Sequence, residues 1–339
     1  MKSIIKSIVI CALVGTGVAH AQQDIHFSQF YSAPTLINPA TTGMFNGNIR
    51  GMVNYRSQWK SVSEPFTTIT AAADARLFEK KEGGFLGLGA AFYNDKAGTS
   101  NLTTGNYALS IAYAFQLDKD VYLSLGVQPG LITKSIDPSG LYYGTQFNGL
   151  NYDNGIASGE SNAAASFKAF DVNAGAYLLY RIDNYNAFYG GISAAHLTRP
   201  NISFLGSTDK MLMKYTFHAG AELALKGTNM VILPNTLVKV QGPNRIINIG
   251  ADFKYVMQQQ SHFTGFVNEL SAGFGAYYRV GDALWGTLQF NWTGLTVAFS
   301  YDLNLSGLSV ATNGLGGMEM MIMYRHGIGN GKGKSTRFL

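Results

Sequence analysis

The sequence has few charged residues: Asp, Glu, Lys and Arg make up 13% of its 339 residues, against about a quarter in ordinary soluble domains. It contains no internal run of eighteen apolar residues, which excludes a protein that crosses a membrane with helices. Cysteine occurs once, as Cys11. Glycine, with 40 residues, and aromatic residues, at 13%, are plentiful instead. This composition is atypical of a water-soluble globular domain.

The first 21 residues have the features of a secretory signal peptide. Two lysines precede an apolar run from Ile8 to Val14, and Ala19-His20-Ala21 has the small-x-small form that signal peptidase accepts. We predict that residues 1–21 are removed after Ala21, and Cys11 with them. The mature chain would then form no disulfide and no thiol metal site. Loss of the two lysines takes Lys+Arg from 25 to 23 against 20 acidic residues, a net charge of about +3, too weak a bias to indicate nucleic-acid binding.

Three consecutive segments near the C-terminus alternate apolar and polar side chains with a period of two. They run from Leu270 to Val280, from Leu284 to Trp292 and from Leu295 to Asn304, and short turns separate them. Period two predicts strands, and two-residue turns predict antiparallel neighbours. Each strand has roughly ten residues, the length that a tilted strand needs to cross a bilayer.

The same alternation occurs in about fourteen segments, an even number as in bacterial single-chain barrels. We therefore predict an all-β fold, a transmembrane antiparallel β-barrel of outer-membrane type, over residues 48–326. A soluble β-sandwich is the alternative, against which the strand length and the outward Leu, Phe and Tyr residues argue. Pro234 predicts a bulge or bend in the ninth strand. The predicted strands are 49–56, 68–77, 85–93, 106–115, 121–131, 170–181, 187–196, 214–225, 230–241, 247–255, 270–280, 284–292, 295–304 and 317–325.

The connections between these strands predict an orientation. If the first strand runs outward from the periplasm, the even-numbered connections face the periplasm and are short, as the turns of such barrels are. The odd-numbered connections are generally longer, and the longest runs from Lys134 to Ser166. It is rich in Asn, Gly and Ser and contains Tyr142, Tyr143, Phe147 and Tyr152. This mixture suits contact with a protein or a glycan; a flexible loop without a partner is the alternative.

Two segments fall outside the predicted barrel. Residues 22–47, which contain Pro34 and Pro39, are not strand-like, and we predict an N-terminal periplasmic or plug segment that closes the barrel mouth or lies beneath it. Residues 327–339 form a basic C-terminal tail, for which contact with periplasmic partners or anionic lipid is a hypothesis.

Charged residues at the inward positions predict pairing rather than ion conduction. Both signs occur in similar number, whereas an ion-selective pore favours one sign. We expect these residues to pair with each other or with the N-terminal segment. They include Arg50, Arg56, Asp74, Arg76, Asp171, Arg181, Glu222, Asp252, Lys254, Arg279 and Asp302.

No catalytic, cofactor or metal site is predicted. No two of the six histidines stand at metal-ligand spacing. His218 shares one predicted inward face with Glu222, which leaves an outer-membrane hydrolase as a hypothesis, but no nucleophile is evident. We expect His218 to be a hydrogen-bonded residue of the barrel interior.

Several motifs resemble those of the PorP/SprF family. Near the mature N-terminus these are Asp24-Ile25-His26-Phe27-Ser28-Gln29-Phe30-Tyr31, Ala33-Pro34, Asn38-Pro39-Ala40, Thr42-Gly43 and Tyr55-Arg56-Ser57-Gln58-Trp59. The runs Tyr301 to Ser306 and Gly314 to Glu319 resemble the family's closing segment. The candidate partner contacts that the motifs give are His26, Phe27, Ser28, Gln29, Asn38, Pro39, Gly43, Arg56, Gln58 and Trp59. The alternative for all of them is packing that specifies the fold.

The resemblance implies a non-enzymatic component of the type IX secretion system in the outer membrane of Bacteroidetes. Members accompany gliding motility and the secretion or surface attachment of large adhesins. The implied partners are the C-terminal domain of a secreted adhesin, other type IX secretion components and the lipid bilayer, with no cofactor. A passive porin-like or small-solute channel is the alternative function. The tail after Arg325 departs from barrels that end on an aromatic residue of the last strand.

Overall fold

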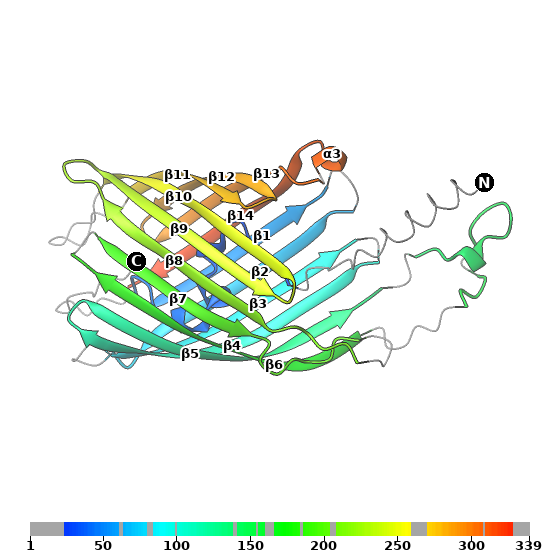
Figure 1. Ribbon diagram of the computed structural model, residues 1–339, viewed down its shortest axis with the longest axis horizontal. Helices are drawn as coiled ribbons and strands as arrows, with labels where there is room; N and C mark the ends of the chain where they lie inside the picture. The colour runs from blue at the N-terminus through cyan, green and yellow to red at the C-terminus, as the bar shows by residue number, and fades with distance from the viewer. Residues whose placement is uncertain are drawn as a thin grey trace, which may run out of the picture.

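The computed structural model describes residues 24–327 apart from 61–63, 80–83, 99, 138–140, 154, 160–165, 184–185, 204–207, 259–269 and 308. Fourteen antiparallel strands close into one barrel, in which each strand pairs with its neighbours in the chain and β14 pairs with β1 (Figure 1). No helix among the described residues is long and apolar enough to span a membrane. The predicted fold class is confirmed. The predicted signal peptide, its cleavage site and the tail from residue 328 lie outside the described residues.

The strands follow one another with bounds close to those predicted. They are β1 Ile49–Gln58, β2 Phe66–Leu77, β3 Phe85–Ala97, β4 Leu102–Asp118, β5 Val121–Ser135, β6 Ser166–Arg181, β7 Ala187–Ala195, β8 Lys214–Ala224, β9 Met230–Gln241, β10 Asn244–Gln258, β11 Leu270–Arg279, β12 Ala283–Trp292, β13 Leu295–Asn304 and β14 Leu315–His326. The short helix α3, Ser309–Thr312, precedes β14.

Alternation along each strand divides the wall into an apolar outside and a polar inside. In β13, Phe299 and Tyr301 are exposed on the outer face, whereas Ser300 and Asp302 are buried on the inner face. Only lipid can cover a continuous outer surface of this kind, because exposed apolar patches of this size are rare on soluble monomers. The inner face holds the polar groups away from that lipid.

Three strand predictions need correction. β3 extends to Ala97, β4 begins at Leu102 and β5 extends to Ser135, all beyond the predicted limits. The hydrogen bonds between these strands continue beyond the bilayer, where the strands need no apolar face. Pro234 causes no bulge: the pairing of β9 with β10 keeps its register through Pro234 and Ala251. Its missing N–H falls on the side of β8, where the ladder is interrupted between Gly220 and Leu223.

The odd-numbered connections, which include residues 136–165, residues 196–213 and α3, share one end of the barrel, called here the α3 end (right in Figure 1). The even-numbered connections share the opposite end. Most of these are short, but β10 ends at Gln258 and β11 begins only at Leu270, and residues 259–269 between them lie outside the described residues.

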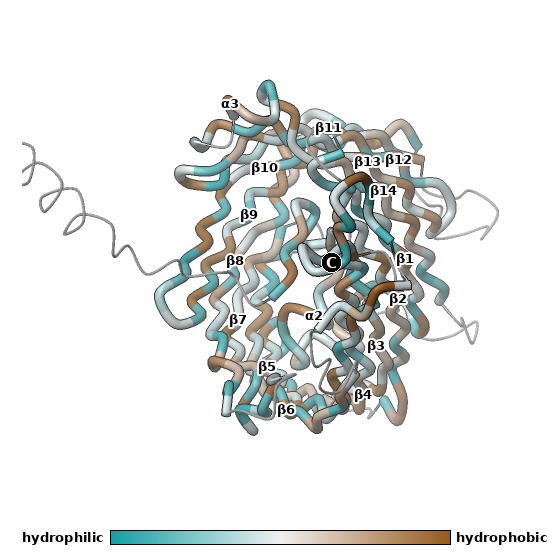
Figure 2. The backbone as a smooth tube through the Cα atoms, turned by 90° about the vertical axis from the view of Figure 1, so that its right-hand side faces the viewer, coloured by the Kyte–Doolittle hydropathy of each residue, from teal (hydrophilic) through white to brown (hydrophobic). Residues whose placement is uncertain are grey.

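Residues 24–47, called here the inner segment, lie inside the barrel. None of residues 24–48 is exposed. The segment contains η1 Phe30–Ser32, α2 Pro34–Ile37 and η2 Pro39–Thr41, and Figure 2 shows α2 within the ring of strands. Asp24 contacts residues at the α3 end, whereas Asn48 bonds His326 at the opposite end. The inner segment therefore runs through the barrel from the α3 end.

Candidate functional site

The interior between the inner segment and the wall contains most of the residues that the motifs single out. At the centre of one group is Arg56, which is buried at the α3 end of β1. Its guanidinium pairs with Glu319 of β14 and, at 3.2 Å, with Asp302 of β13. Arg279 of β11 also lies 3.5 Å from Asp302. Arg279 also pairs with Asp282 at 2.9 Å. Two cations thus face three anions, so each cation of this network already has an anionic partner.

Ser28 and Gln29 of the inner segment complete that network. Their backbone N–H groups donate to the Glu319 carboxylate at 2.6 and 2.9 Å. The Ser28 hydroxyl donates to Asp302 at 2.7 Å and accepts from Arg56 at 2.8 Å. Bonds to ionised groups are stronger than neutral ones. The inner segment is consequently fixed to β1, which follows it in the chain, and to β13 and β14, which are far from it in sequence.

Asn38 fixes the middle of the inner segment. Its amide nitrogen lies 2.9 Å from the carbonyl oxygen of Ala176 and 3.1 Å from His218 Nε2, and its side-chain oxygen accepts from Ala40 N at 3.0 Å. A Cβ at Gly175 would stand 2.0 Å from that side-chain oxygen. Only glycine therefore fits at this position of the wall, where the Asn38 side chain lies against it. His218 stacks on Tyr177 and is a hydrogen-bonded interior residue, as expected.

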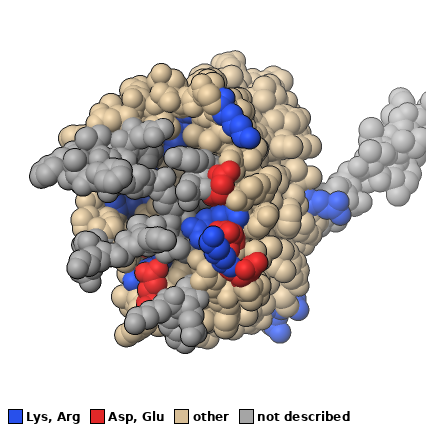
Figure 3. Space-filling model, turned by 90° about the vertical axis from the view of Figure 1, so that its left-hand side faces the viewer, with Lys and Arg blue, Asp and Glu red and all other residues tan. Residues whose placement is uncertain are grey.

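Gly43 fixes the inner segment near the opposite end of the barrel. Its N–H donates to Asp74 at 2.7 Å, and Asp74 accepts from Arg50 at 2.8 and 2.9 Å. Arg76 donates to the carbonyl oxygens of Gly43 and Phe45 at 3.0 and 2.5 Å. Arg50, Asp74 and Arg76 therefore pair with each other or with the inner segment, as the mixed signs predict for these residues. Figure 3, which views this end, shows charged side chains gathered near its middle.

Asp24 fixes the inner segment at the α3 end. Its carboxylate lies 2.9 Å from His196 Nε2 and also contacts the Lys214 ammonium. His196 Nδ1 lies 2.8 Å from Asp171 Oδ2. His196 follows β7 directly and has a positive φ of 60°, a conformation that is uncommon outside glycine. The imidazole is thus held between two carboxylates.

An aromatic group fills the interior beside these polar contacts. Tyr31 stacks on Tyr277, and Tyr277 stacks on Trp285 with ring centroids 5.2 Å apart. The Tyr277 hydroxyl donates to Asp252 at 2.5 Å, and Thr287 donates to the same carboxylate at 2.6 Å. The Asp252 carboxylate is therefore held by hydroxyl donors and not by a cation.

Five of the candidate contacts from the motifs remain, three in the inner segment and two at the end of β1. Phe27 and Pro39 are buried, and His26 is half-buried in the inner segment. Gln58 ends β1, and Trp59 has a positive φ of 58° and packs edge-on against Phe66. These two residues lie at the α3 end.

The aromatic connection at the α3 end has a structure of its own. Phe147 and Tyr152 form a β-bridge, and the Tyr152 ring lies 5.4 Å from the rings of both Phe147 and Tyr142. Leu150 between them is 93% exposed. Residues 141–159, called here the aromatic loop, therefore combine an ordered aromatic group with an exposed apolar tip.

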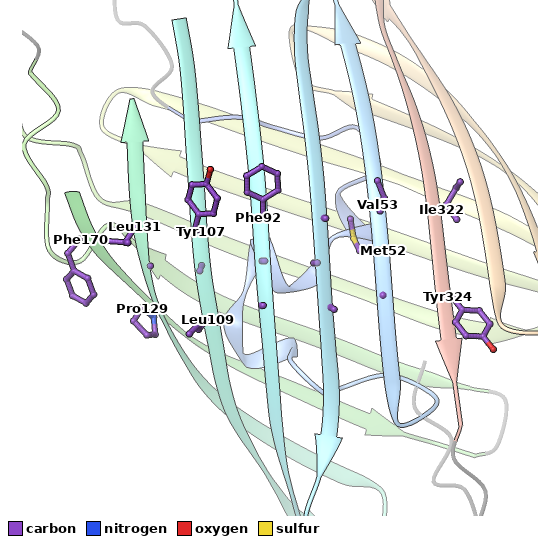
Figure 4. Close-up of a pocket in the computed structure, with 18 residues that line it drawn as sticks. Met52, Val53, Phe92, Tyr107, Leu109, Pro129, Leu131, Phe170, Ile322 and Tyr324 are labelled. Carbon is purple, nitrogen blue, oxygen red and sulfur yellow. The ribbon is translucent and has the colours of Figure 1, made fainter. Parts of the chain in front are cut away.

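A hollow of about 1040 Å³ lies on the outer wall across β1 to β6 (Figure 4). Its floor contains small residues such as Gly51, Ala71 and Ala90, and Phe92 and Tyr107 stand around them. Its lining contains no charged side chain. This hollow is part of the outward apolar face of the barrel. It is therefore suited to contact with lipid rather than to catalysis.

No group of three or more His, Cys, Asp or Glu residues among the described residues could hold a metal ion. The sequence reasoning did not single out Asp24, His196 or Glu319. Period two would have identified Glu319, because Met318 and Met320 on either side of it are exposed. Asp24 lies in no strand, and His196, which the predicted strand included, directly follows the end of β7.

The chain matches the model of one protein family and is similar to several solved structures. Residues 19–324 match the model of a family described as type IX secretion system membrane protein PorP/SprF. No curated protein matches the chain. The toluene transporter TodX of Pseudomonas putida is similar at 10% identity and a TM-score of 0.47, covering 86% of this chain and 91% of its own. The CymD monoaromatic hydrocarbon channel has 10% identity and a TM-score of 0.45, with 87% and 93% covered.

Proposed function

This chain belongs to the PorP/SprF family of type IX secretion system membrane proteins, and from that premise we propose that it supports the secretion or surface anchoring of a large adhesin. It docks the C-terminal domain of that cargo and performs no catalysis. The single observation that carries this proposal is the family match over residues 19–324.

The closed interior supports docking at the rim rather than passage through the lumen. The inner segment has no exposed residue between Asp24 and Asn48, and its contacts include Glu319, His218 and Asp74 on distant strands. A partner can therefore reach the connections at the ends of the barrel more readily than its interior.

We propose that the α3 end faces the cell exterior. The longest connections lie there, as in outer-membrane barrels, and so does the aromatic loop with its exposed Leu150. Aromatic side chains offer large contact areas at low entropic cost. The cargo then contacts the aromatic loop and the rim near Trp59. Short turns at the opposite end face periplasmic components of the secretion system. Export removes residues 1–21.

Gene deletion and complementation test this function. Cells that lack the protein should lose surface adhesins, measured by protease shaving of intact cells and mass spectrometry, and should lose gliding. Complementation with the natural chain should restore both. A chain lacking residues 141–159 should reach the outer membrane in normal amount and restore neither. Unchanged adhesins and motility in the deletion strain would overturn the proposal.

A further inference from the structure

The carboxylate of Asp24 is surrounded by basic side chains from four strands or their ends. Besides His196 after β7 and Lys214 at the start of β8, Lys134 of β5 and Lys239 of β9 interact with it electrostatically. Asp24 is the first residue that the structure describes. One carboxylate from the inner segment thus directly contacts two basic side chains of the wall and acts at longer range on two more, while Asp171 also pairs with His196 and Asp209 also acts on Lys134.

Lys239 is a buried cation of this group for which no direct anion is described. Its side chain is on the inner face of β9 and only 9% exposed. Among the described residues it has no hydrogen bond or ion pair within contact distance. A buried ammonium is costly unless an anion compensates it. The basic side chains near Asp24 can therefore accept a carboxylate that bonds the Lys239 ammonium directly.

A small cavity of about 30 Å³ adjoins this group between the inner segment and the wall. His196 and Lys214 line it, together with polar residues such as Asn173 and Ser193. The volume is enough for about one water molecule. A second carboxylate cannot enter beside Asp24, so a ligand must take the place of Asp24.

We propose that Lys134, His196, Lys214 and Lys239 form a carboxylate-binding site that the chain's own Asp24 occupies, and that an acidic peptide segment of the secreted partner displaces it on docking. The chemistry of the ligand follows from its present occupant, a carboxylate on a peptide. The network around Arg56 does not serve in this way, because Arg56 and Arg279 already pair with Glu319, Asp302 and Asp282 of the wall and its turns. This inference rests on the proposed function for the identity of the partner.

Peptide binding to the full-length protein in detergent tests the site. The probes are a fluorescent Gly-Ser-Gly-Glu peptide with an amidated C-terminus and its twin with Gln in place of Glu. Asp24→Asn should bind the Glu peptide at least tenfold more tightly than the Gln twin, because the site is vacated. The natural chain should bind the Glu peptide more weakly than Asp24→Asn does. Adding Lys239→Gln to Asp24→Asn should weaken the binding of the Glu peptide at least fivefold. Adding Lys210→Gln instead should leave the binding unchanged, because Lys210 is an exposed lysine in the connection that contains His196.

A second measurement keeps the test valid if Asp24→Asn does not fold. Ile25→Cys in the chain with Asp24 intact gives a thiol at the α3 end of the inner segment. The Glu peptide should accelerate its reaction with a maleimide at least threefold, and Lys239→Gln should abolish this acceleration.

Equal binding of the two peptides, or no effect of Lys239→Gln, would overturn the site. Displacement of the peptide by inorganic phosphate at lower concentration than acetate would overturn the carboxylate assignment and indicate a phosphate ligand. Both results leave the gene-deletion experiment unaffected, so failure of the site and failure of the proposed function are distinguishable.

Discussion

Glu319 joins the inner segment to the wall through its buried carboxylate. It accepts from two backbone N–H groups, at Ser28 and Gln29, and it pairs with Arg56. All of these groups are buried, so water does not replace a lost contact. Breaking a buried pair by removing one partner leaves an uncompensated charge, which is strongly destabilising.

Glu319→Gln should therefore lower the free energy of unfolding by about 3–5 kcal/mol. Urea unfolding in lipid vesicles, followed by tryptophan fluorescence, measures this change. Met320→Leu is the matched control, because the neighbouring Met320 faces lipid and the volume is conserved. If both variants unfold at the same urea concentration, the network around Arg56 does not hold the inner segment.

Gly175→Ala should release the middle of the inner segment. A Cβ at this position would stand 2.0 Å from the Asn38 side-chain oxygen and 3.0 Å from the Ile192 carbonyl oxygen, so Asn38 must leave its bonds. The expected result is proteolysis within residues 24–47 at least tenfold faster than in the natural chain. Gly286→Ala, whose Cβ would meet nothing closer than 3.9 Å, should leave the rate unchanged. Equal rates for the two variants would contradict this contact.

The sequence predicted the inward direction of Arg56 and Asp302 but not their partners. The alternation with period two predicts whether a side chain points into the barrel or out of it. It does not predict which residue of another strand that side chain contacts. The contact between Arg56 and Glu319 depends on the closure of β1 on β14, across 263 residues. Asp24 and His196 were not singled out: Asp24 lies in no strand, and His196 directly follows the end of β7.

The aromatic loop is held together by elements within itself. Gln146 Nε2 donates to the Ile156 carbonyl oxygen, and Asp153 N donates to the Gln146 carbonyl oxygen. Tyr152 joins the two sides of the loop through Phe147 and Tyr142. Leu150 makes no part of this group and is exposed. The order of the loop and its proposed partner contact can therefore be separated.

Tyr152→Ala should disorder the aromatic loop, because it removes two aromatic pairs of about 0.5–1.5 kcal/mol each. The measurement is the rate of proteolysis within residues 141–159 in the folded barrel, expected to rise at least threefold. Leu150→Ala should leave that rate unchanged and still lower the amount of adhesin on intact cells. Normal adhesin levels with Leu150→Ala would show that the tip of the loop does not bind the cargo.

All fourteen strands could be predicted from the sequence, because each alternates strongly and most end at polar turns. The limits of β3 to β5 could not, since beyond the bilayer both faces are polar and the pattern disappears. The path of the inner segment could not be predicted either. It contains short helices and no period, and its position depends on side chains of distant strands, such as His218 for Asn38.

At the scale of the whole molecule, the barrel and the inner segment form one closed structure. Bonds at Asp24, at Ser28 and Gln29, at Asn38 and at Gly43 are spaced along the full depth of the interior. Arg50, Arg56 and Arg279 pair with acidic side chains of the wall, so cations and anions alternate in the interior. A passive channel requires an open water path, and the inner segment lies inside the barrel where that path would run.

The natural chain should therefore record no open-channel steps in a planar lipid bilayer. Deletion of residues 28–43 should produce ohmic steps, because the wall then surrounds a polar space large enough for ions. Gly286→Ala serves as a control that is purified and inserted in the same way and should stay silent. Steps from the natural chain at the frequency of the deletion variant would favour the passive channel. If neither chain conducts, residues other than the inner segment close the lumen. The inner segment is supported as the closure only if the natural chain does not conduct and the deletion variant does.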